Sequence, residues 1–278
     1  MRKPLAEGSP IDTKRYRRWI NRFGSYRDPV TRPMIEDWLS QFKKTDTDLA
    51  ARILDSVEYF GNSQIWAAYR EALDSLQGWS RRSAERKGEW RFAAMSSSAG
   101  ESGDGMLYQF RLANSLDGNR YKKLFVGRSE LVEQRLGPDD TVVLLDDFSG
   151  TGKQICQAWN DPETAYGELL ANVGRVYVVV VAASKSARMK ITAETRLSLV
   201  PAHELNEKDC VFSESCVHFS AADRKTLLHY GAIASKKAPK GYGECGFVVV
   251  FQHRTPNNSI PILHVDNRNW SGLFPRHV

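Results

Sequence analysis

The residues best suited to chemistry lie together in one short segment, VVLLDDFSGTGKQI, at positions 142–155. Four apolar residues are followed by two adjacent carboxylates, Asp146 and Asp147, and then by a turn bracketed by two glycines and ended by Lys153. The peptide N–H groups of such a loop, with the positive end of a following helix, form an anion site suited to one phosphate. Glycines let that backbone approach a ligand closely. Two carboxylates beside the site suit vicinal hydroxyls, so the segment predicts a phosphorylated ribose as ligand.

The string GTGK within this segment also suggests the P-loop of nucleoside triphosphatases. A Walker A loop needs a glycine five residues before the glycine that precedes the lysine, and Ser or Thr directly after the lysine. Those two positions hold Asp147 and Gln154. The spacing therefore excludes a P-loop of that class.

The acidic pair has a second interpretation that the sequence leaves open. Carboxylates before a helix often cap its first N–H groups, so both aspartates would then serve the helix alone. A cap needs one acid, whereas this strand ends in two, Asp146 and Asp147. We therefore favour ligand contact, with Asp147 as a general base that assists an incoming amine or hydroxyl and Asp146 orienting the ribose.

The elements that must position this segment follow from hydrophobic periodicity. The run TVVLLDD at 141–147 and the continuous β-branched run RVYVVVVAA at 175–183 are typical of strands covered on both faces. Alternation of strands and helices predicts an α/β fold with a mostly parallel sheet, in which ligands lie beyond the carboxyl ends of the strands. Lys185 follows the second run, at the same edge, and is a candidate contact for an acceptor base or nucleotide. Shorter strands are expected at 89–95, 122–127, 196–200 and 246–253, and helices at 106–116, about 152–174 and 222–236.

The chain is expected to divide into a helical region, 1–88, and an α/β domain, 89–278, whose C-terminal end is a loop element. Helix starts at Thr31, Thr45 and Asn62 are each followed by an apolar stripe of 3.6-residue period. Such stripes are structural by default, so this region is expected to be a helical cap or a docking bundle.

Composition limits the partners that the chain can have. A length of 278 residues with 41% hydrophobic residues is enough for a buried core, and a net charge of +6 favours acidic partners, including nucleic acid, nucleotides and acidic proteins. Basic residues concentrate at 13–27, where aromatic residues recur at helical spacing. This segment is either an amphipathic helix docked by its aromatic stripe or a basic clamp on nucleic acid or an acidic partner.

The cysteines and the N-terminus favour a cytoplasmic protein without a membrane span. Cys156, Cys210, Cys216 and Cys245 have no regular spacing and are expected to be reduced thiols. A zinc site formed with His218 is not expected, because no CxxC is present. No apolar stretch approaches the ~18 residues of a membrane helix, and the N-terminus lacks the apolar core of a signal peptide.

The segment VVLLDDFSGTGK resembles the phosphoribosyl-pyrophosphate signature of the type I phosphoribosyltransferase fold, in which an apolar strand, two acids and a short Gly/Thr loop follow one another. The resemblance implies that Asp146 and Asp147 hold the ribose 2′- and 3′-hydroxyls and Mg²⁺. It implies a 5′-phosphate loop of Ser149, Gly150, Thr151, Gly152 and Lys153. It also implies that the serine- and glycine-rich loop at 96–105 faces pyrophosphate, through Ser98, Gly100, Ser102 and Gly103.

A narrower resemblance extends over nearly the whole chain. In order, WLSQF, AGESGDG, DDFSGTGKQ, HRTPNNSIPILH and WSGLFPR resemble a phosphoribosyltransferase-like family from bacterial conflict operons. Members of that family occur beside partner proteins in antiphage systems, including some retrons. The resemblance implies a role in defence and a protein partner from the same operon.

Several residues depart from the pattern of catalytic members. Gln154 stands where a small or hydroxyl residue is usual, and the pyrophosphate-facing loop contains Glu101 and Asp104 but no basic residue. These carboxylates would repel pyrophosphate unless Mg²⁺ or arginines such as Arg128 and Arg135 intervene. Two functions therefore stay open: an enzyme that transfers a ribosyl or phosphoribosyl group with Mg²⁺, and a noncatalytic sensor of phosphoribosyl pyrophosphate or nucleotide whose helical region docks on a partner.

Overall fold

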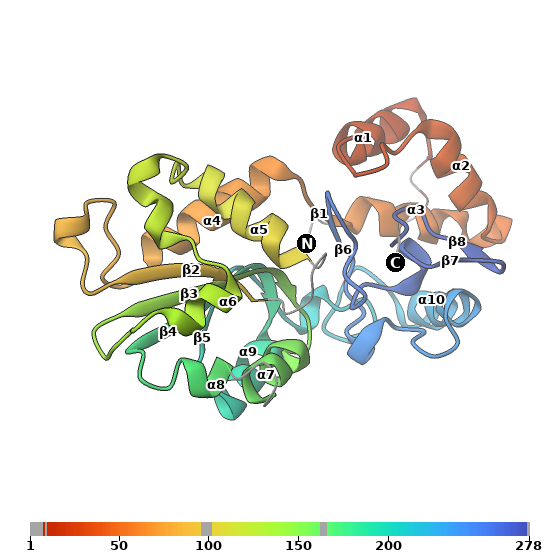
Figure 1. Cartoon of the computed structure of the whole chain (residues 1–278). Helices are drawn as coiled ribbons and strands as arrows, with labels where there is room; N and C mark the ends of the chain where they lie inside the picture. The colour runs from red at the N-terminus through yellow and green to blue at the C-terminus, as the bar shows by residue number, and fades with distance from the viewer. Residues whose placement is uncertain (1–7, 9, 96–101, 162–165, 277–278) are drawn as a thin grey trace. The chain divides into compact units, whose positions relative to one another are not determined.

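The computed structural model describes residues 8, 10–95, 102–161 and 166–276, and the contacts within it divide the chain into two units. Unit 1 contains residues 1–62 and 206–278, and unit 2 contains residues 63–205. Unit 1 therefore joins the two ends of the chain, which are red and blue in Figure 1.

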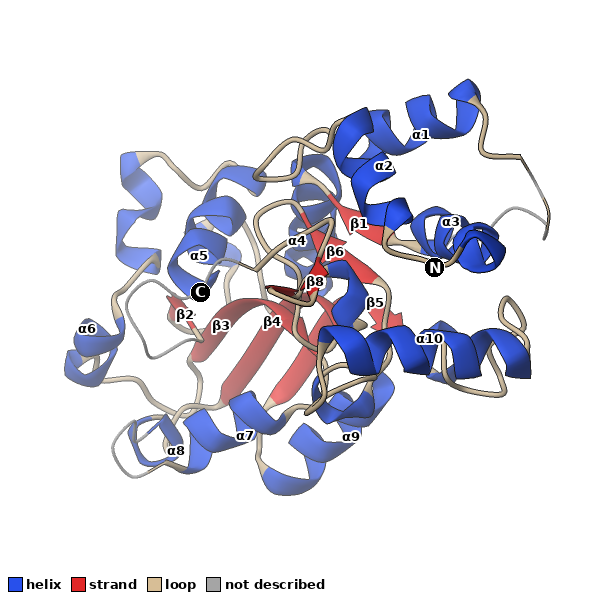
Figure 2. Cartoon of the chain, turned by 90° about the vertical axis from the view of Figure 1, so that its right-hand side faces the viewer, coloured by secondary structure: helices blue, strands red, loops and turns tan. Residues whose placement is uncertain are grey.

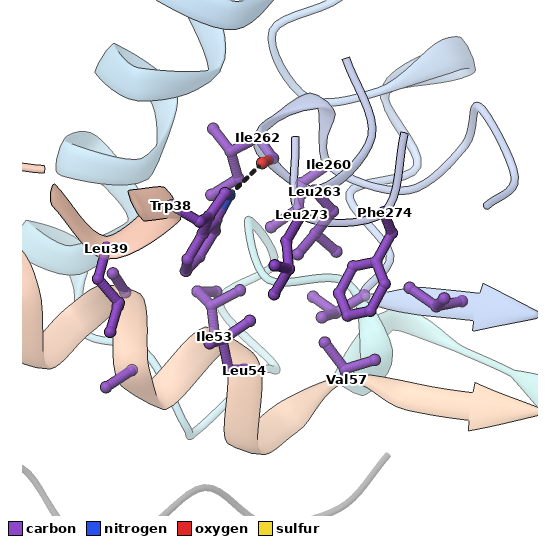
Figure 3. Close-up of a cluster of buried hydrophobic side chains, with 14 of the residues drawn as sticks. Trp38, Leu39, Ile53, Leu54, Val57, Ile260, Ile262, Leu263, Leu273 and Phe274 are labelled. Carbon is purple, nitrogen blue, oxygen red and sulfur yellow. Dashed lines mark hydrogen bonds between the residues drawn. The ribbon is translucent and has the colours of Figure 1, made fainter. Parts of the chain in front are cut away.

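Unit 1 is mostly helical, with short strand pairs. Its elements are α1 (Thr13–Phe23), α2 (Arg32–Ser40), η1 (Lys44–Asp46), α3 (Thr47–Ser56), β1 (Glu58–Phe60), η4 (Glu207–Asp209), α10 (Ala221–Ala234), η5 (Tyr242–Glu244), β6 (Val249–Phe251), η6 (Pro261–Leu263), β7 (Asp266–Asn267) and β8 (Trp270–Ser271). The apolar stripes of α2 and α3 pack against the C-terminal segment, as Figure 3 shows. The indole N–H groups of Trp38 and Trp270 both donate to the carbonyl oxygen of Ile262, at 2.8 and 2.9 Å. The bond from Trp38 anchors the C-terminal segment to α2, and the bond from Trp270 fixes that segment locally.

The basic helix α1 is attached to the C-terminal end of α3 through one buried carboxylate. Asp55 accepts hydrogen bonds from Arg15 at 2.7 Å, from Arg18 at 2.8 Å and from the Trp19 indole at 2.9 Å. Arg22 donates to the backbone carbonyl of Asp55 at 2.9 Å. Three of the arginines in the expected basic clamp thus make contacts within the unit.

Unit 2 is built on a four-stranded parallel sheet of order β2-β3-β4-β5. Its elements are α4 (Asn62–Ser75), η2 (Ser83–Glu85), β2 (Trp90–Ala94), α5 (Ser102–Ala113), η3 (Asn119–Leu124), α6 (Arg128–Glu133), β3 (Thr141–Ser149), α7 (Lys153–Asn160), α8 (Tyr166–Leu169), β4 (Arg175–Ser184), α9 (Lys185–Glu194) and β5 (Ser198–Leu205). The predicted α/β class with a mostly parallel sheet is confirmed.

Helices cover both faces of this sheet, which explains the continuous apolar stretches 142–145 of β3 and 176–183 of β4. Figures 1 and 2 place α4 and α5 over one face and α7, α8 and α9 over the other. On the second face, Ile155 and Trp159 of α7 and Ile191 of α9 share a buried cluster with alternate valines and leucines of β3 and β4.

Three expectations from the sequence are corrected. Residues 122–127 do not form a strand, since Asn119–Leu124 is a 3-10 helix and only Phe125 pairs, in a single parallel bridge with Phe92. The strand expected at 246–253 is shortened to β6, and it pairs with β1 in a separate two-stranded sheet. Helix α3 begins at Thr47 because residues 44–46 first form a 3-10 turn.

The contacts also divide the chain at other positions, after residues 62 and 205, than the boundary expected between residues 88 and 89. Helix α4 belongs with the sheet, since the ring of its Tyr69 packs edge-on against Phe110 of α5, with the centroids 5.5 Å apart. Residues 206–278 belong with the first helices, through the cluster that contains Trp38 and Trp270. Apolar stripes alone do not say which core a helix joins, because any apolar face can bury against any other.

Candidate functional site

The strand order of unit 2 reverses beside β3. Phe92 of β2 pairs with Phe125 and also with Val143 of β3, so these two partners lie on opposite edges of β2. The chain therefore leaves β2 toward one edge, returns past it, and continues through β3, β4 and β5 on the other side. Open α/β sheets bind ligands at such a reversal, outside the carboxyl ends of the strands. A ligand is therefore expected at the carboxyl end of β3, where the acidic pair lies.

Asp146 and Asp147 lie near the carboxyl end of β3, where Asp146 is opposite Val180 of β4. Both residues are at least nine-tenths buried. The backbone N–H of Asp147 donates to Oδ1 of Asp146 at 2.9 Å. Helix α7 begins four residues after Ser149 with Gly152 at its N-cap and no capping side chain. Neither aspartate is therefore the N-cap residue of α7.

Gly152 is required where it stands by two separate features. Its φ of 72° lies in the left-handed region, which favours glycine. A Cβ added there would also lie 2.9 Å from the carbonyl oxygen of Ala187 and 3.1 Å from Cγ1 of Ile191. The glycine thus lets the loop turn into α7 while packing directly on α9.

Ser184, the last residue of β4, ties that loop to the neighbouring helix. Its buried hydroxyl donates to the carbonyl oxygen of Gly150 at 2.6 Å and accepts the N–H of Ala187, in the first turn of α9, at 2.8 Å. Its single hydrogen is engaged by Gly150, so the Ser186 hydroxyl, 2.8 Å away, is the donor in their contact. The sequence analysis missed this residue, although a serine before a helix is a recognisable N-cap signal.

Tyr69 of α4 supports β3 at the acidic pair. Its hydroxyl is buried and donates to the backbone carbonyl of Asp146 at 2.9 Å. Burial raises the pKa of Tyr69 well above its ordinary value, and the nearby charges of Asp147 and Asp146 raise it further. The phenol therefore stays protonated and remains a donor. No local sequence signal could have shown that this residue of an apolar helical stripe reaches the strand.

The other predicted ligand residues lie at or after the ends of three strands, β2, β3 and β4. Ser149 is buried, Thr151 is half-buried and its hydroxyl accepts the N–H of Lys153 at 3.3 Å, while the Lys153 side chain is exposed. Lys185 is exposed and is the first residue of α9, after β4. Ser98 and Gly100 lie outside the described residues, and Ser102 and Gly103 begin α5, the helix that follows β2. The loop that follows β3 and Lys185, which directly follows β4, thus come from neighbouring strand ends.

Over the described residues, no three His, Cys, Asp or Glu side chains are grouped so that they could hold a metal ion. The four cysteines are free thiols, in agreement with the sequence analysis. Burial raises the pKa of the thiols of Cys210 and Cys216, which keeps them protonated. A cation at the acidic pair would therefore need oxygen ligands from substrate and water.

The comparison with protein families covers most of the chain, since the model of the PRTase-CE family matches residues 35–276. The chain belongs to this phosphoribosyltransferase-like family. The PRTase-CE match includes the acidic pair and its loop and extends through both units, whereas helix α1 precedes it.

Other comparisons add little to the PRTase-CE assignment. No curated protein matches this chain. The structure of the AQ2163 protein from Aquifex aeolicus is 14% identical, with a TM-score of 0.33, over 64% of this chain and 86% of that one. A similarity of this extent carries no argument about function. Among the helices of the described residues, none has the length and apolar character needed to cross a membrane.

Proposed function

We propose that this chain is a phosphoribosyltransferase-like effector or accessory protein of a bacterial antiphage defence system, which binds phosphoribosyl pyrophosphate or a related nucleotide at residues 146–153 and transfers its ribosyl or phosphoribosyl group. One observation carries the proposal: two buried carboxylates and a glycine loop that opens into α7 lie together at the reversal of the strand order. Membership of a phosphoribosyltransferase-like family supports the ligand class. The ordered motifs of the sequence support the defence context and a protein partner from the same operon.

Each part of the loop would have its own role toward the ligand. The peptide N–H groups at the start of α7 and the helix dipole would bind the 5′-phosphate, with Lys153 as an exposed cation beside it. The carboxylates of Asp146 and Asp147 would accept hydrogen bonds from the ribose hydroxyls. Ser184 and Tyr69 would hold the loop and the strand in place through the two carbonyl groups that they bind.

The donor set also suits Mg²⁺ when substrate is present. Adjacent residues of a regular strand point to opposite faces, so one carboxylate of the pair is expected to reach a given ion. Mg²⁺ commonly takes one or two carboxylates and fills its remaining positions with water and substrate phosphate. Asp146 or Asp147 would hold it, and it would supply neutralisation of the pyrophosphate leaving group.

In the transfer, the bond between the ribose anomeric carbon and pyrophosphate breaks, and a bond from that carbon to an amine or hydroxyl acceptor forms. Positive charge develops on the sugar, which nearby carboxylates stabilise. Asp147 would accept the proton that the acceptor loses, and Asp146 would orient the ribose. Lys185 would contact the acceptor, since it follows the neighbouring strand of the sheet.

One observation favours the alternative, a noncatalytic nucleotide sensor or partner-binding module that uses the fold as a switch. Asp104 lies in the first turn of α5, which includes the last four residues, 102–105, of the expected pyrophosphate loop. The N-terminus of a helix stabilises negative charge, so a carboxylate there would occupy the position that would otherwise suit an anionic leaving group. Such a module would bind a nucleotide without releasing pyrophosphate.

The test is calorimetric titration of the full chain with phosphoribosyl pyrophosphate and Mg²⁺, with pyrophosphate release measured on the same samples. The site variant is Asp146→Asn/Asp147→Asn, and the matched control, Asp74→Asn/Asp117→Asn, removes two exposed carboxylates of the same unit. Binding that only the site variant loses, together with release by the unmodified chain, supports the transferase. Binding without release supports the sensor, and no binding by the unmodified chain contradicts both.

A further inference from the structure

The charges of unit 2 are unevenly distributed. Residues 63–205 contain equal numbers of basic and acidic residues, 18 of each. Yet two segments, 78–91 and 117–123, together contain eight Lys or Arg residues and three Asp or Glu residues. We call the exposed and half-buried cations of these segments, other than Arg91, which pairs with Glu89, the basic face. Its members are Arg81, Arg82, Arg86, Lys87, Arg120, Lys122 and Lys123.

The first segment is a built loop that closes on itself between α4 and β2. The N–H of Lys87 donates to the carbonyl of Gly78 at 3.2 Å, and Nε of Arg86 donates to the carbonyl of Ser80 at 2.6 Å. The Arg86 guanidinium also stacks over the ring of Trp79, 4.7 Å from its centre. The backbone that carries the cations is therefore fixed before any partner binds, which lowers the entropy lost on binding.

The second segment lies against the same strand as the first. Trp79, from the loop, and Phe125, which follows η3, both pack on Phe92 of β2, each with ring centres 5.3 Å apart. In η3, the guanidinium of Arg120 lies 4.6 Å from the ring centre of Tyr121. Burial lowers the pKa of Arg86, and the electrostatic effect of Tyr121 opposes that shift, which relates the two segments. The two segments thus form one surface, toward the left of unit 2 in Figure 1.

Most of these cations are not neutralised within the described part of the chain. Arg82 pairs with Glu85 at 3.1 Å, but the ion pairs found among the described residues include none with Arg81, Lys87, Lys122 or Lys123, all of which are exposed. Close like charges repel one another, and a bound polyanion removes that repulsion. The large exposed apolar residues of the described chain all lie outside both segments. A protein partner would need such apolar anchors, whereas the phosphates of a nucleic acid would not.

We propose that the basic face binds the phosphate backbone of a nucleic acid without reading its sequence. The first segment precedes β2, and the neighbouring strands β3 and β4 begin beside it, so the face lies at the amino ends of the strands. The acidic pair lies at the carboxyl end of β3. A nucleic acid on the basic face therefore leaves the phosphoribosyl site open, and the proposal does not depend on what that site binds.

The experiment measures binding of fluorescein-labelled single-stranded 20-nucleotide DNA and RNA of mixed sequence to the full chain by anisotropy, between 50 and 300 mM salt. The face variant is Arg81→Gln/Lys87→Gln/Lys122→Gln/Lys123→Gln. The matched control, Lys14→Gln/Arg17→Gln/Lys236→Gln/Lys237→Gln, removes four exposed cations from unit 1 and also tests the expected basic clamp at 13–27. Urea unfolding of all three proteins checks that each is folded.

The face variant is expected to bind on the order of 100-fold more weakly at 0.1 M salt. The slope of log affinity against log salt is expected to fall by about 3, because each phosphate that a side chain no longer neutralises lowers it by about 0.7. The control is expected to retain the slope of the unmodified chain. Equal losses of affinity in both variants, or a loss only in the control, would overturn the proposal. Binding of polyglutamate as tight as that of the oligonucleotides would also overturn it, since the face would then suit an acidic protein.

Discussion

Replacing Ser184 by alanine tests whether the hydroxyl at the end of β4 holds the loop between β3 and α7. The change removes the N-cap of α9, where the hydroxyl accepts from Ala187, and such caps contribute about 1 kcal/mol. It also removes the buried 2.6 Å bond to the Gly150 carbonyl, which contributes about 1 kcal/mol. We expect unit 2 to lose about 2 kcal/mol of unfolding free energy. The amides of residues 150–153 should exchange with solvent about 30-fold faster, if they exchange through local opening.

The assay combines urea unfolding with amide hydrogen exchange on the full chain. The control is Ser186→Ala, because the Ser186 side chain is exposed and its hydroxyl contacts that of Ser184. It should change the unfolding free energy by less than about 0.5 kcal/mol. If Ser184→Ala is equally mild, or if it destabilises the unit while the exchange of residues 150–153 is unchanged, the reasoning is refuted.

Three further outcomes follow from the packing. Gly152→Ala should destabilise unit 2 by about 1–3 kcal/mol in urea unfolding, because of its positive φ and the close Ala187 carbonyl, whereas Gly105→Ala, in open space on α5, should stabilise it by about 0.5–1 kcal/mol. Asp55→Ala should destabilise unit 1 by about 3–5 kcal/mol, because Arg15 is buried against that carboxylate, and Arg15→Met/Asp55→Leu should recover much of the loss. Burial and the charge of Arg276 lower the pKa of His264 to about 4. As the pH falls, the imidazole therefore takes up a proton in the unfolded chain before it does so in the folded one, and the free energy of unfolding should fall by about 3 kcal/mol from pH 6.5 to pH 4. His264→Gln should flatten that fall.

The sheet of unit 2 was predictable because its signals are local. The strands β3 and β4 contain the continuous apolar stretches 142–145 and 176–183, which are typical of strands covered on both faces. The acidic pair and the glycine turn after β3 are likewise local signals, and the phosphate site that they indicate stays a prediction. The prediction of a short strand at 122–127 was wrong, because only Phe125 pairs there. A single bridge is enough to reverse the strand order, but it leaves no periodic pattern in the sequence.

What the sequence could not show are contacts between residues far apart in the chain. Tyr69 reaches the carbonyl of Asp146 across 77 positions, and Ser184 reaches Gly150 across 34. Trp38 and Trp270 meet at one carbonyl of the C-terminal segment, which joins the two ends of the chain in a single core. Each of these residues looks ordinary in its own segment, because the partner that gives it a role is supplied by the fold.

The charge of the chain illustrates the same point for function. The net charge of +6 belongs to unit 1, since unit 2 is neutral, and α1 is its most basic helix. However, Arg15, Arg18 and Arg22 of that helix all donate hydrogen bonds to Asp55, near the end of α3. In unit 2, by contrast, Lys122 and its neighbours stay exposed, without acidic partners among the described residues. Affinity for a polyanion follows from cations that remain available at the surface, so the neutral unit is the better candidate for binding nucleic acid.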